Sequence, residues 1–236
     1  MSETPIEGGE LLEGSDKATA VEQMFDRIAP RYDMVNRLMT FRLDVRWRRR
    51  TVKQLDLPKS SVVLDLACGT GDLCNDLLAS GLSAVGVDFS AGMLAAARTD
   101  APLLRADALN LAVPDHSVDG ATCGFAMRNF TDLSAFFVEL GRVIRPGGRI
   151  GLLDVAEPRS RVLRIGHRMY FGKVVPKIGA LLSDKRAYAY LPKSVAYLPD
   201  PAEMMASLRN AGFSDATRTL LSGGITQMLT GTRDLR

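Results

Sequence analysis

The side chains best suited to bind a small molecule surround a glycine-containing turn in the first third of the sequence. The apolar run Val62–Leu66 contains Asp65 and leads into Gly69 and Gly71. Leucines at helical spacing, beginning with Leu73, follow the turn, so it lies between the carboxyl end of a strand and the amino end of a helix. Because the two glycines lack side chains that would block a ligand, we expect a nucleotide-like cofactor here.

The residues around this turn distinguish between cofactor classes. A dinucleotide-binding turn would have Gly or Ala three positions after Gly71, where this chain has Cys74, and no Lys-Ser/Thr pair follows as a P-loop requires. The spacing Asp65-x-x-x-Gly69-x-Gly71 resembles motif I of class I methyltransferases. This resemblance implies S-adenosylmethionine as the cofactor, bound by Asp65 and by the Gly69-Thr70-Gly71 turn. Taken alone, this turn could also be a tight connection between the strand and the helix that binds no ligand.

Further residues at the ends of the following strands support a bound cofactor. Asp88 ends an apolar run and is placed to accept hydrogen bonds from ribose hydroxyls, each worth about 1.5–3 kcal/mol. Asp107 and Ala108 follow the third strand at the expected adenine edge, although Asp107 also suits a helix cap. Gly124 follows at the end of the fourth strand. Because acidic residues follow successive strands, a turn that binds no ligand is the less favoured interpretation.

Composition limits the class of protein. The chain has 236 residues, of which 46% are hydrophobic, and this suits one α/β domain with an insertion. Its net charge of +3 does not require nucleic acid as a partner. The sequence has neither an apolar run of membrane-spanning length nor an apolar signal core, so we expect a cytoplasmic protein. The three cysteines lack C-x-x-C spacing and only two histidines are present, so we expect no metal site.

The order of the predicted elements indicates one Rossmann-like, doubly wound domain. Strands alternate with helices up to a fifth strand at Arg149–Val155, which implies a parallel sheet with its ligands at the carboxyl ends of the strands. Two further strands separated by Ser222-Gly223-Gly224 complete a seven-stranded sheet with an antiparallel end. Residues 1–17 are polar and are expected to be a disordered leader, so the domain covers 18–236.

The first part of the domain, residues 18–57, is expected to be helical. Apolar residues at helical spacing predict an amphipathic helix that ends at Pro30, and a strongly basic helix follows. These helices either pad the sheet or form a lid over the cofactor. The lid is favoured by Tyr32, Asp33 and Asn36, because polar side chains beside a helix break suit a ligand better than a core.

An insertion interrupts the alternation at residues 159–193. It contains nine Lys or Arg residues, one acid at Asp184 and many apolar residues, and we expect a helical cap. The cap either packs its apolar side on the domain or also forms the mouth for an apolar substrate and rests on an anionic membrane surface. In the second case each Lys or Arg near the surface adds about 1 kcal/mol of attraction.

Segments along most of the chain resemble the ubiquinone/menaquinone biosynthesis C-methyltransferases, from about residue 21 to residue 232. The segments that carry the resemblance are Phe25-Asp26-x-x-Ala29-Pro30-Arg31-Tyr32-Asp33-x-x-Asn36, Val63–Asp72, Gly124–Phe130, Arg142–Arg149, Tyr188–Val195 and Leu221–Ile225. The chain departs from the family at Asp44, Gly124 and Asp154-Val155-Ala156, where His, Ser and Glu-x-Ser are frequent. Gly124 lacks a hydroxyl expected near the cofactor, and together with Ala156 it leaves the substrate open.

The resemblance implies methylation of a ring carbon of a prenylated quinol, with demethylmenaquinol to menaquinol as the favoured reaction. Arg128 is the first candidate to hold the developing phenolate, with Asn129 orienting it, because both follow the fourth strand. The alternative for Arg128 is a structural clamp on the lid. The base is either Asp33 or a water held by Arg128. Second-rank candidates for contacts with the substrate or the lid are Tyr32, Asp33, Asn36 and Tyr190.

Other functions stay open at this stage. A methyltransferase acting on another phenol or quinone, such as a ubiquinone precursor or a natural product, is the main alternative, and a non-catalytic module that only binds the cofactor is another. Nucleic-acid methylation is disfavoured because no Asn/Asp-Pro-Pro-aromatic motif follows Val118-Asp119 and no Pro-Cys nucleophile is present. Peripheral contact with the inner face of the cell membrane and a homodimer are both compatible with the sequence.

Overall fold

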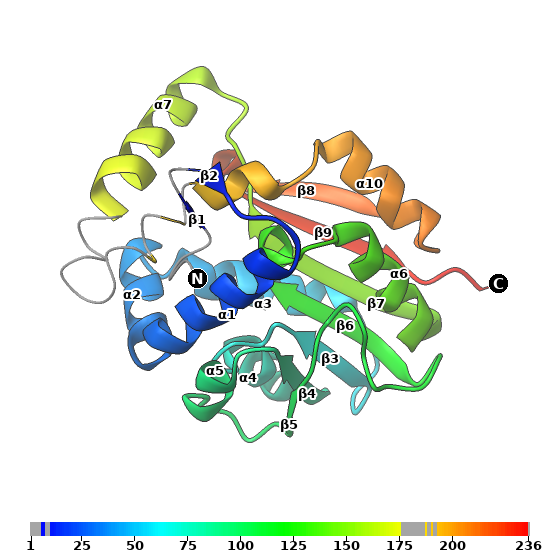
Figure 1. Cartoon of the computed structure of the whole chain (residues 1–236). Coiled ribbons are helices and arrows are strands. Elements are labelled where there is room, and N and C mark those ends of the chain that lie inside the picture. The colour runs from blue at the N-terminus through cyan, green and yellow to red at the C-terminus, as the bar shows by residue number, and fades with distance from the viewer. Residues whose placement is uncertain (1–5, 8–9, 176–186, 188–189, 191–192, 236) are drawn as a thin grey trace.

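A seven-stranded sheet forms the centre of the computed structural model, which describes residues 6–7, 10–175, 187, 190 and 193–235 (Figure 1). The strand order is β5-β4-β3-β6-β7-β9-β8. The strands of this sheet are β3 (Val62–Leu66), β4 (Ser83–Asp88), β5 (Leu103–Arg105), β6 (Val118–Gly124), β7 (Ile144–Val155), β8 (Thr217–Leu221) and β9 (Thr226–Thr232). The first five are parallel, and β9 pairs antiparallel with both β7 and β8. The predicted fold class is therefore confirmed.

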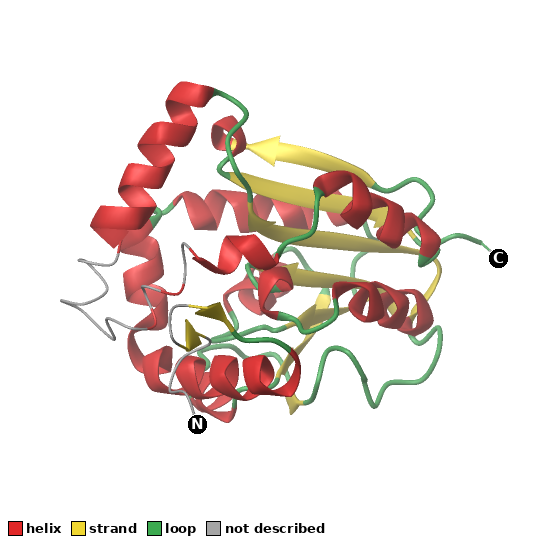
Figure 2. Ribbon diagram, turned by 45° about the horizontal axis from the view of Figure 1, so that its top comes forward, coloured by secondary structure: helices red, strands yellow, loops and turns green. Residues whose placement is uncertain are grey.

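Helices cover both faces of the sheet (Figure 2). The helices of the first half are α1 (Gly14–Ile28), η1 (Ala29–Arg31), α2 (Tyr32–Met39), α3 (Leu43–Leu55), α4 (Asp72–Ala79) and α5 (Ala91–Ala95). Those of the second half are η2 (Met127–Asn129), α6 (Leu133–Val143), α7 (Arg161–Met169), η3 (Tyr170–Val174), η4 (Val195–Tyr197), α10 (Pro201–Asn210) and η5 (Ser222–Gly224). One apolar cluster joins α6 and α10 to the sheet, and another joins α3 and α4 to it.

Local sequence explains where several helices begin. Ser90 and Asp132 precede α5 and α6, and their side chains accept hydrogen bonds from the N–H groups of Met93 and Ala135. Such N-caps satisfy donors that the first turn of a helix leaves without partners. Because α5 begins directly after β4, this cap also fixes the path of the chain beside the carboxyl edge of the sheet.

The N-terminal segment differs from the expected disordered leader. A short antiparallel pair, β1 (Ile6–Glu7) with β2 (Glu10–Leu11), precedes α1, and α1 already begins at Gly14. Lys17 is buried, donates to the carbonyl oxygen of Phe130 over 2.7 Å and lies 3.6 Å from the ring centroid of Tyr197. These long-range contacts order residues 14–17, which the prediction placed outside the domain.

One predicted boundary is confirmed and another is wrong. α1 ends at Ile28, just before Pro30, as predicted, and Pro30 itself occupies the first turn of η1, where its missing N–H loses no helical bond. β7 begins at Ile144 rather than Arg149, so the Pro146-Gly147-Gly148 segment lies within a long strand instead of a connection. The predicted hairpin around Ser222–Gly224 is confirmed.

The predicted cap begins as expected with the helical elements α7 and η3. In both views α7 lies on the same side of the molecule as α2 (Figure 1 and Figure 2). The rest of the cap, residues 176–186, 188–189 and 191–192, lies outside the described residues.

Candidate active site

The glycine turn and the end of β6 lie at the switch point of the sheet. β3 and β6 are neighbours, although the chain first runs outward from β3 to β5 before it returns to β6. Gly69 follows β3 and Gly124 ends β6, so both lie at the edge where open α/β sheets bind their ligands. Gly69 has a φ of +56°, and apart from its chain neighbours no heavy atom lies within 4 Å of the position that a Cβ would take. A ligand can therefore approach its backbone.

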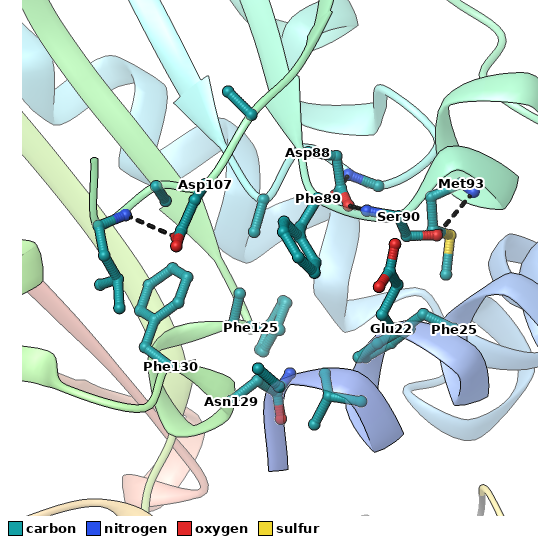
Figure 3. Close-up of a pocket in the computed structure, with 18 of the residues that line it drawn as sticks. Glu22, Phe25, Asp88, Phe89, Ser90, Met93, Asp107, Phe125, Asn129 and Phe130 are labelled. Carbon is teal, nitrogen blue, oxygen red and sulfur yellow. Dashed lines mark hydrogen bonds between the residues drawn. The ribbon is translucent and has the colours of Figure 1, made fainter. Parts of the chain in front are cut away.

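Two cavities meet at this turn. The smaller cavity lies beside the ends of β4 and β5 and is lined on its other side by α1 (Figure 3). The larger cavity has a volume of about 1070 Å³ and is lined by residues of α2, α3, α7 and the glycine turn. The residues that line both cavities are Tyr32, Ala67, Gly69, Gly124 and Phe125. Ligands in the two cavities can therefore come into contact at these residues.

Gly71 has a different role from the predicted one. Its φ is +88°, and a Cβ at this position would lie 2.6 Å from Cγ2 of Thr99. Its N–H donates to the carbonyl oxygen of Cys68 over 3.0 Å, and it precedes α4. The backbone conformation and the close packing of Thr99 explain this glycine, whereas Gly69 is the one that faces the cavities.

Asp88 lies in the wall of the smaller cavity, where the ribose was expected (Figure 3). Its Oδ2 accepts from the N–H of Gly69 over 2.7 Å and its Oδ1 from the N–H of Ser90 over 2.8 Å. Burial raises the pKa of Asp88, while these backbone donors act in the opposite direction. The carboxyl group thus joins the glycine turn to the start of α5.

Asp107 and Ala108 also line the smaller cavity, as predicted for the adenine side. Asp107 is exposed, and its Oδ1 accepts from the N–H of Leu109 over 2.9 Å, which closes a local turn instead of capping a helix. Ala108 is buried, and Phe89, Leu109 and Phe130 supply further apolar wall.

Asp65 is completely buried and forms part of the wall of the larger cavity. Thr122 Oγ1 donates to its Oδ1 over 2.8 Å, and Cys74 Sγ lies 3.5 Å from its Oδ2. Burial raises the pKa of Asp65 to about 7, against the lowering effect of these two donors. Near neutral pH this carboxyl group is therefore partly protonated.

Arg128 is buried and fixed by several contacts. Its Nη1 donates to Oδ1 of Asp154 and to the carbonyl oxygen of Phe125, each over 2.5 Å, and its Nε donates to Oγ of Ser194 over 3.1 Å. Asp154 Oδ2 also accepts from the Arg128 N–H over 3.1 Å. These contacts are those of a structural clamp, and they hold the side chain in the wall of the larger cavity.

Asn129 and Arg128 are neighbours in the chain but line different cavities. Asn129 lines the smaller cavity, whereas Arg128 lines the larger one. Tyr190 is completely buried in an apolar cluster with residues of α1 and α2, and it donates through its hydroxyl to Oδ1 of Asn129 over 3.1 Å. It therefore packs against the helices predicted to form the lid, and its contact with a substrate stays a prediction.

The lid residues come together at the junction of the cavities. Tyr32 lines both cavities, and Asp33 and Asn36 line the larger one. Thr70 Oγ1 donates to Oδ1 of Asp33 over 2.5 Å, so α2 is bonded directly to the glycine turn. Burial raises the pKa of Tyr32, against the lowering effect of a hydrogen bond with Asn36 and of the Arg128 charge.

Two of the departures from the family, Gly124 and Ala156, lie in the cavity walls. A Cβ on Gly124 would lie 2.8 Å from Cδ1 of the buried Leu73, so Leu73 fills the space that a serine here would need. Ala156 is buried, lines the larger cavity and donates its N–H to the carbonyl oxygen of Ile225 over 3.0 Å.

Sequence reasoning missed a carboxylate that holds α1 in place. Asp26 Oδ1 accepts from Oγ of Ser90 over 2.5 Å and from the N–H of Gly92 over 2.8 Å. These two hydrogen bonds fasten α1 to the amino end of α5, beside Asp88. The family signature contained Asp26, but its partners lie more than 60 residues away.

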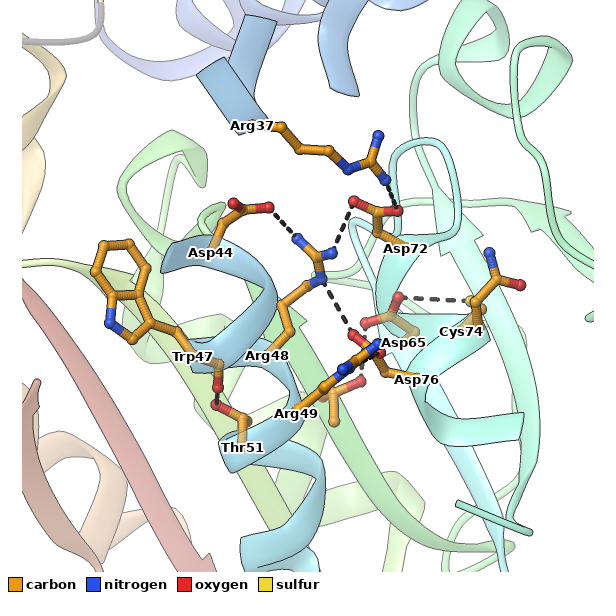
Figure 4. A network of polar contacts seen from close by, with 12 residues as sticks. Arg37, Asp44, Trp47, Arg48, Arg49, Thr51, Asp65, Asp72, Cys74 and Asp76 are labelled. Carbon is orange, nitrogen blue, oxygen red and sulfur yellow. Dashed lines mark hydrogen bonds and ion pairs between the residues drawn. The ribbon is translucent and has the colours of Figure 1, made fainter. Parts of the chain in front are cut away.

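A second missed feature is the charged network between the lid and α4 (Figure 4). Arg48 is buried at its centre and pairs with Asp44 over 2.6 Å, with Asp72 over 3.0 Å and with Asp76 over 3.3 Å. Arg37 also pairs with Asp72, over 2.7 Å. In the sequence this region appears as a strongly basic helix, whose charges would be exposed if it only padded the sheet. The sequence does not show that one of its arginines is buried among three acids.

Within the described ranges, no helix has both the length and the apolar character needed to cross a membrane. In the same part of the chain, no three His, Cys, Asp or Glu side chains group in a way that could hold a metal ion.

Sequence comparison finds relatives along almost the whole chain. The model of the ubiE/COQ5 methyltransferase family matches residues 13–233. A demethylmenaquinone methyltransferase of Roseiflexus castenholzii is 43% identical, covering 91% of this chain and 94% of that protein. The one of Thermus thermophilus is also 43% identical, over 89% of this chain and 100% of that protein. A ubiquinone/menaquinone biosynthesis C-methyltransferase of Geobacter sulfurreducens is 37% identical, over 94% of this chain and 91% of that protein.

Solved structures support the same placement. A putative methyltransferase from an antibiotic biosynthesis pathway of Anabaena variabilis superposes with a TM-score of 0.59 at 27% identity, over 75% of this chain and 65% of that one. A methyltransferase structure from Thermotoga maritima has a TM-score of 0.62 at 20% identity, over 89% of this chain and 98% of that one, and shows a shared fold. From the family model, the relatives and the two cavities at the switch point, we conclude that this chain belongs to the ubiE/COQ5 methyltransferase family.

Proposed function

We propose that this protein transfers the methyl group of S-adenosylmethionine to a ring carbon of demethylmenaquinol and so forms menaquinol. The observation that carries the proposal is the pair of cavities that meet at Tyr32, Gly69 and Gly124. A cofactor bound across the glycine turn and a quinol ring in the larger cavity would meet there. The names of the relatives from Roseiflexus and Thermus supply the substrate class.

The residues around the turn fit S-adenosylmethionine. Gly69 faces open space, so the backbone can approach the amino acid part of the cofactor. Asp65 provides a carboxyl group for its cationic amine, and Asp88 provides acceptors at the ribose. Phe89 and Leu109 give an apolar slot for the adenine, with Asp107 at its edge. The carboxyl groups of Asp65, Asp88 and Asp107 suit a cationic ligand without phosphates.

The chemistry requires an ionised ring hydroxyl and little water. When bound, S-adenosylmethionine supplies a methyl group made electrophilic by its positively charged sulfur. Loss of the hydroxyl proton makes the adjacent ring carbon of the quinol nucleophilic, and that carbon then loses its own proton after the new C–C bond forms. If the hydroxyl has a pKa near 10, its ionisation at pH 7 costs about 4 kcal/mol. The lid helices exclude water and align the ring for in-line transfer.

Arg128 and Asp33 would divide the work on the ring hydroxyl. The guanidinium of Arg128, fixed by Asp154 and Ser194, would stabilise the phenolate without having to reorganise. Asp33 lies in the same cavity, and its Oδ1 already accepts from Thr70, so its carboxylate is oriented to take up the proton. Asn129, which lies in the smaller cavity, would act on the cofactor side.

The membrane would be the source of this substrate. α7 exposes Val162, Ile165 and Met169 beside basic residues of the cap, so it suits peripheral contact with an anionic surface at the inner face of the cell membrane. The quinol could then pass into the larger cavity without crossing water.

Incubation with methyl-labelled S-adenosylmethionine and reduced demethylmenaquinone tests the proposal. We expect the label in a ring carbon of the product, detected by mass spectrometry with fragmentation. Label on oxygen, or labelling only of soluble phenols in a parallel panel, would instead support the alternative acceptor class to which Gly124 and Ala156 point. Binding of the cofactor without any labelled product would indicate a binding module.

A further inference from the structure

The linker between α2 and α3 has an unusual backbone. Phe41 and Arg42 have φ values of +52° and +60°, so two consecutive residues with side chains adopt the left-handed conformation that favours glycine. Hydrogen bonds from Arg42 N to Arg37 O, over 2.9 Å, and from Leu43 N to Thr40 O, over 3.0 Å, hold this turn. Strain of this kind persists where the surrounding structure fixes it, and it often marks a functional position.

The turn displays a large aromatic side chain at the mouth of the larger cavity. Phe41 is 73% exposed, and it also lines that cavity. Its ring centroid lies 5.9 Å from that of Tyr170, whose hydroxyl donates to the carbonyl oxygen of Met39 over 2.8 Å. These contacts join the strained turn to η3, so Phe41 is held in place although most of its surface faces solvent.

α7 supplies further exposed apolar residues to the wall of the same cavity. Val162 and Leu163 line the cavity and are 79% and 49% exposed, so they too lie where the cavity meets the surface. Gly166 and Gly172 also line it, and among the described residues no heavy atom beyond the local backbone lies within 4 Å of the position of a Cβ on either glycine. A glycine inside a helix costs stability, so two of them facing open space keep a path clear along α7 and η3.

The cavity is therefore polar at one end and largely apolar at the other. Asp33, Asn36 and Arg128 lie at the inner end beside the glycine turn, whereas Phe41, Val162 and Leu163 lie at the outer end. Its volume of about 1070 Å³ reaches the upper limit of pockets for drug-sized ligands, roughly 1,000 Å³, and exceeds what a two-ring head group needs. This polarity matches a molecule with a polar ring at one end and a hydrocarbon chain at the other.

We propose that the outer end is the exit for the isoprenoid tail of the quinol, and that Phe41 on its strained turn sets the preference for tailed over tailless substrates. The inference rests on the proposed function and adds the route of the tail. The tail would pass between Phe41 and Val162 along the glycine-lined path, with its far end in the lipid. Buried apolar area between Phe41 and the tail would then contribute to binding of the quinol and not of the cofactor.

The test compares Phe41→Asn with Val138→Asn. Asparagine tolerates the left-handed conformation, so the first change removes the ring and keeps the turn. Val138 is 62% exposed on α6 and lies outside both cavities. Val138→Asn is therefore the matched control, because it also removes exposed apolar surface. The substrates are reduced naphthoquinones with no tail, one isoprene unit and three isoprene units, assayed without lipid or detergent micelles.

We expect the ratio of kcat/KM for the three-unit substrate to that for the tailless one to fall about tenfold in Phe41→Asn, as loss of one buried aromatic contact implies, and to stay unchanged in Val138→Asn. The same ratio in Phe41→Asn and the unchanged protein would overturn the tail exit. So would an equal loss for all three substrates, which would mean that Phe41 only supports the fold. No turnover of any naphthoquinol by the unchanged protein would overturn the proposed function as well.

A binding measurement that does not depend on turnover is available because the chain has one tryptophan. Trp47 lines the larger cavity, and its Nε1 donates to Oγ of Ser222 over 2.9 Å. Oxidised naphthoquinones bound there should quench its fluorescence. We expect the dissociation constant to fall with tail length in the unchanged protein and to lose this dependence in Phe41→Asn. If the tail dependence is the same in both proteins, and only affinity for lipid vesicles falls in Phe41→Asn, Phe41 contacts the membrane and the tail exit is wrong.

Discussion

Asp65, the proposed partner of the cofactor amine, shows how burial changes a carboxyl group. The side chain is inaccessible to solvent, and its pKa is raised to about 7, chiefly by burial. Two donors, Thr122 and Cys74, are too few to compensate for the lost hydration. The positive charge of the cofactor amine would favour the ionised form, so binding and deprotonation become linked.

We predict that affinity for S-adenosylmethionine rises with pH around neutrality, by at most about tenfold per pH unit below the pKa of Asp65. The folded, cofactor-free protein keeps a proton that the unfolded chain loses above its ordinary pKa of 3.8, so its stability should fall as the pH rises from there to about 7. Calorimetry in buffers of different ionisation enthalpy measures the released proton. An affinity independent of pH in the wild type, or an unaltered profile in Asp65→Asn, would contradict this linkage.

Arg128 combines a structural ion pair with its proposed place at the reacting ring. Its partner Asp154 is completely buried, so loss of the guanidinium would leave a carboxylate with no compensating charge nearby. An alanine variant can therefore lose activity simply because the fold is weaker.

We predict that Arg128→Ala lowers the free energy of unfolding by about 3–5 kcal/mol, as expected for breaking a buried ion pair. Ser194→Ala removes one hydrogen bond to the same side chain and should cost about 1 kcal/mol. Urea unfolding followed by circular dichroism compares the two variants. Equal, small losses of unfolding free energy in the two variants would show that the ion pair contributes little to stability. A loss of activity in Arg128→Ala would then report the catalytic role of the side chain directly.

The residues near the strand ends were predictable, whereas those that connect distant elements were not. Asp65 lies one residue before the end of β3 and Asp88 ends β4, and parallel strands bring their carboxyl ends to one edge, so both lie at the site. Asp26 and Lys17 could not be assigned in this way. Their partners Ser90 and Phe130 lie 64 and 113 residues away, and the helical pattern of α1 does not show which distant residues its charged side chains contact.

Among the elements, α1 does most to enclose the cofactor side. Ala18, Val21, Glu22 and Phe25 of this helix line the smaller cavity, and Asp26 joins it to the amino end of α5. A Cβ on Gly92 would lie 2.8 Å from Cα of Asp26, so the two helices are in close contact. Opening of α1 would expose the cofactor, which supports its proposed role as a lid.

We predict that Asp26→Ala weakens S-adenosylmethionine binding about tenfold, because roughly one charge-assisted hydrogen bond that keeps α1 closed is lost. Amide hydrogen exchange in α1 should become faster at the same time. Asp16→Ala, an exposed change on the same helix, is the control and should change neither property. Slower or equal exchange in α1 of Asp26→Ala would show that this carboxylate does not hold the helix.

Boundaries of elements were predicted less well than their order, for physical reasons. The segment 14–17 is polar and has no helical periodicity, and only the burial of Lys17 against Phe130 and Tyr197 shows why α1 extends so far. Pro146-Gly147-Gly148 is typical of a turn, yet Ile144 pairs with Val118 and the segment continues β7. In both cases tertiary contacts outweigh local preference.

At the scale of the molecule, exposed apolar residues gather on the side that carries α2 and α7. They are Met34, Leu38, Phe41, Val162, Leu163, Ile165, Met169 and Val174. α7 also carries the basic residues Arg161 and Arg164, so this side combines the two features that favour contact with an anionic bilayer.

We predict binding to vesicles that contain anionic lipid, weak binding to zwitterionic vesicles, and loss of binding as the salt concentration increases, because exposed charges are screened. Arg161→Glu, on α7, should reduce binding roughly tenfold or more, since a charge reversal removes about 1 kcal/mol of attraction and adds repulsion. Lys53→Glu, near the end of α3, carries the same change in net charge and should have a small effect. Equal effects of the two reversals in co-sedimentation would mean that only net charge matters and that α7 does not face the membrane.

The two ends of the chain lie at opposite edges of the sheet. The carbonyl oxygen of Leu12 accepts from the hydroxyl of Tyr197 over 2.5 Å, and Lys17 is bonded to the loop after η2, so the first helix is built into the site. β9 runs antiparallel to β7 and ends where Thr232 pairs with Arg149, at the edge away from both cavities. A fluorescent fusion or a surface tether therefore belongs after β9, at the edge away from both cavities, whereas the same attachment before α1 would pull on the helix that lines the smaller cavity.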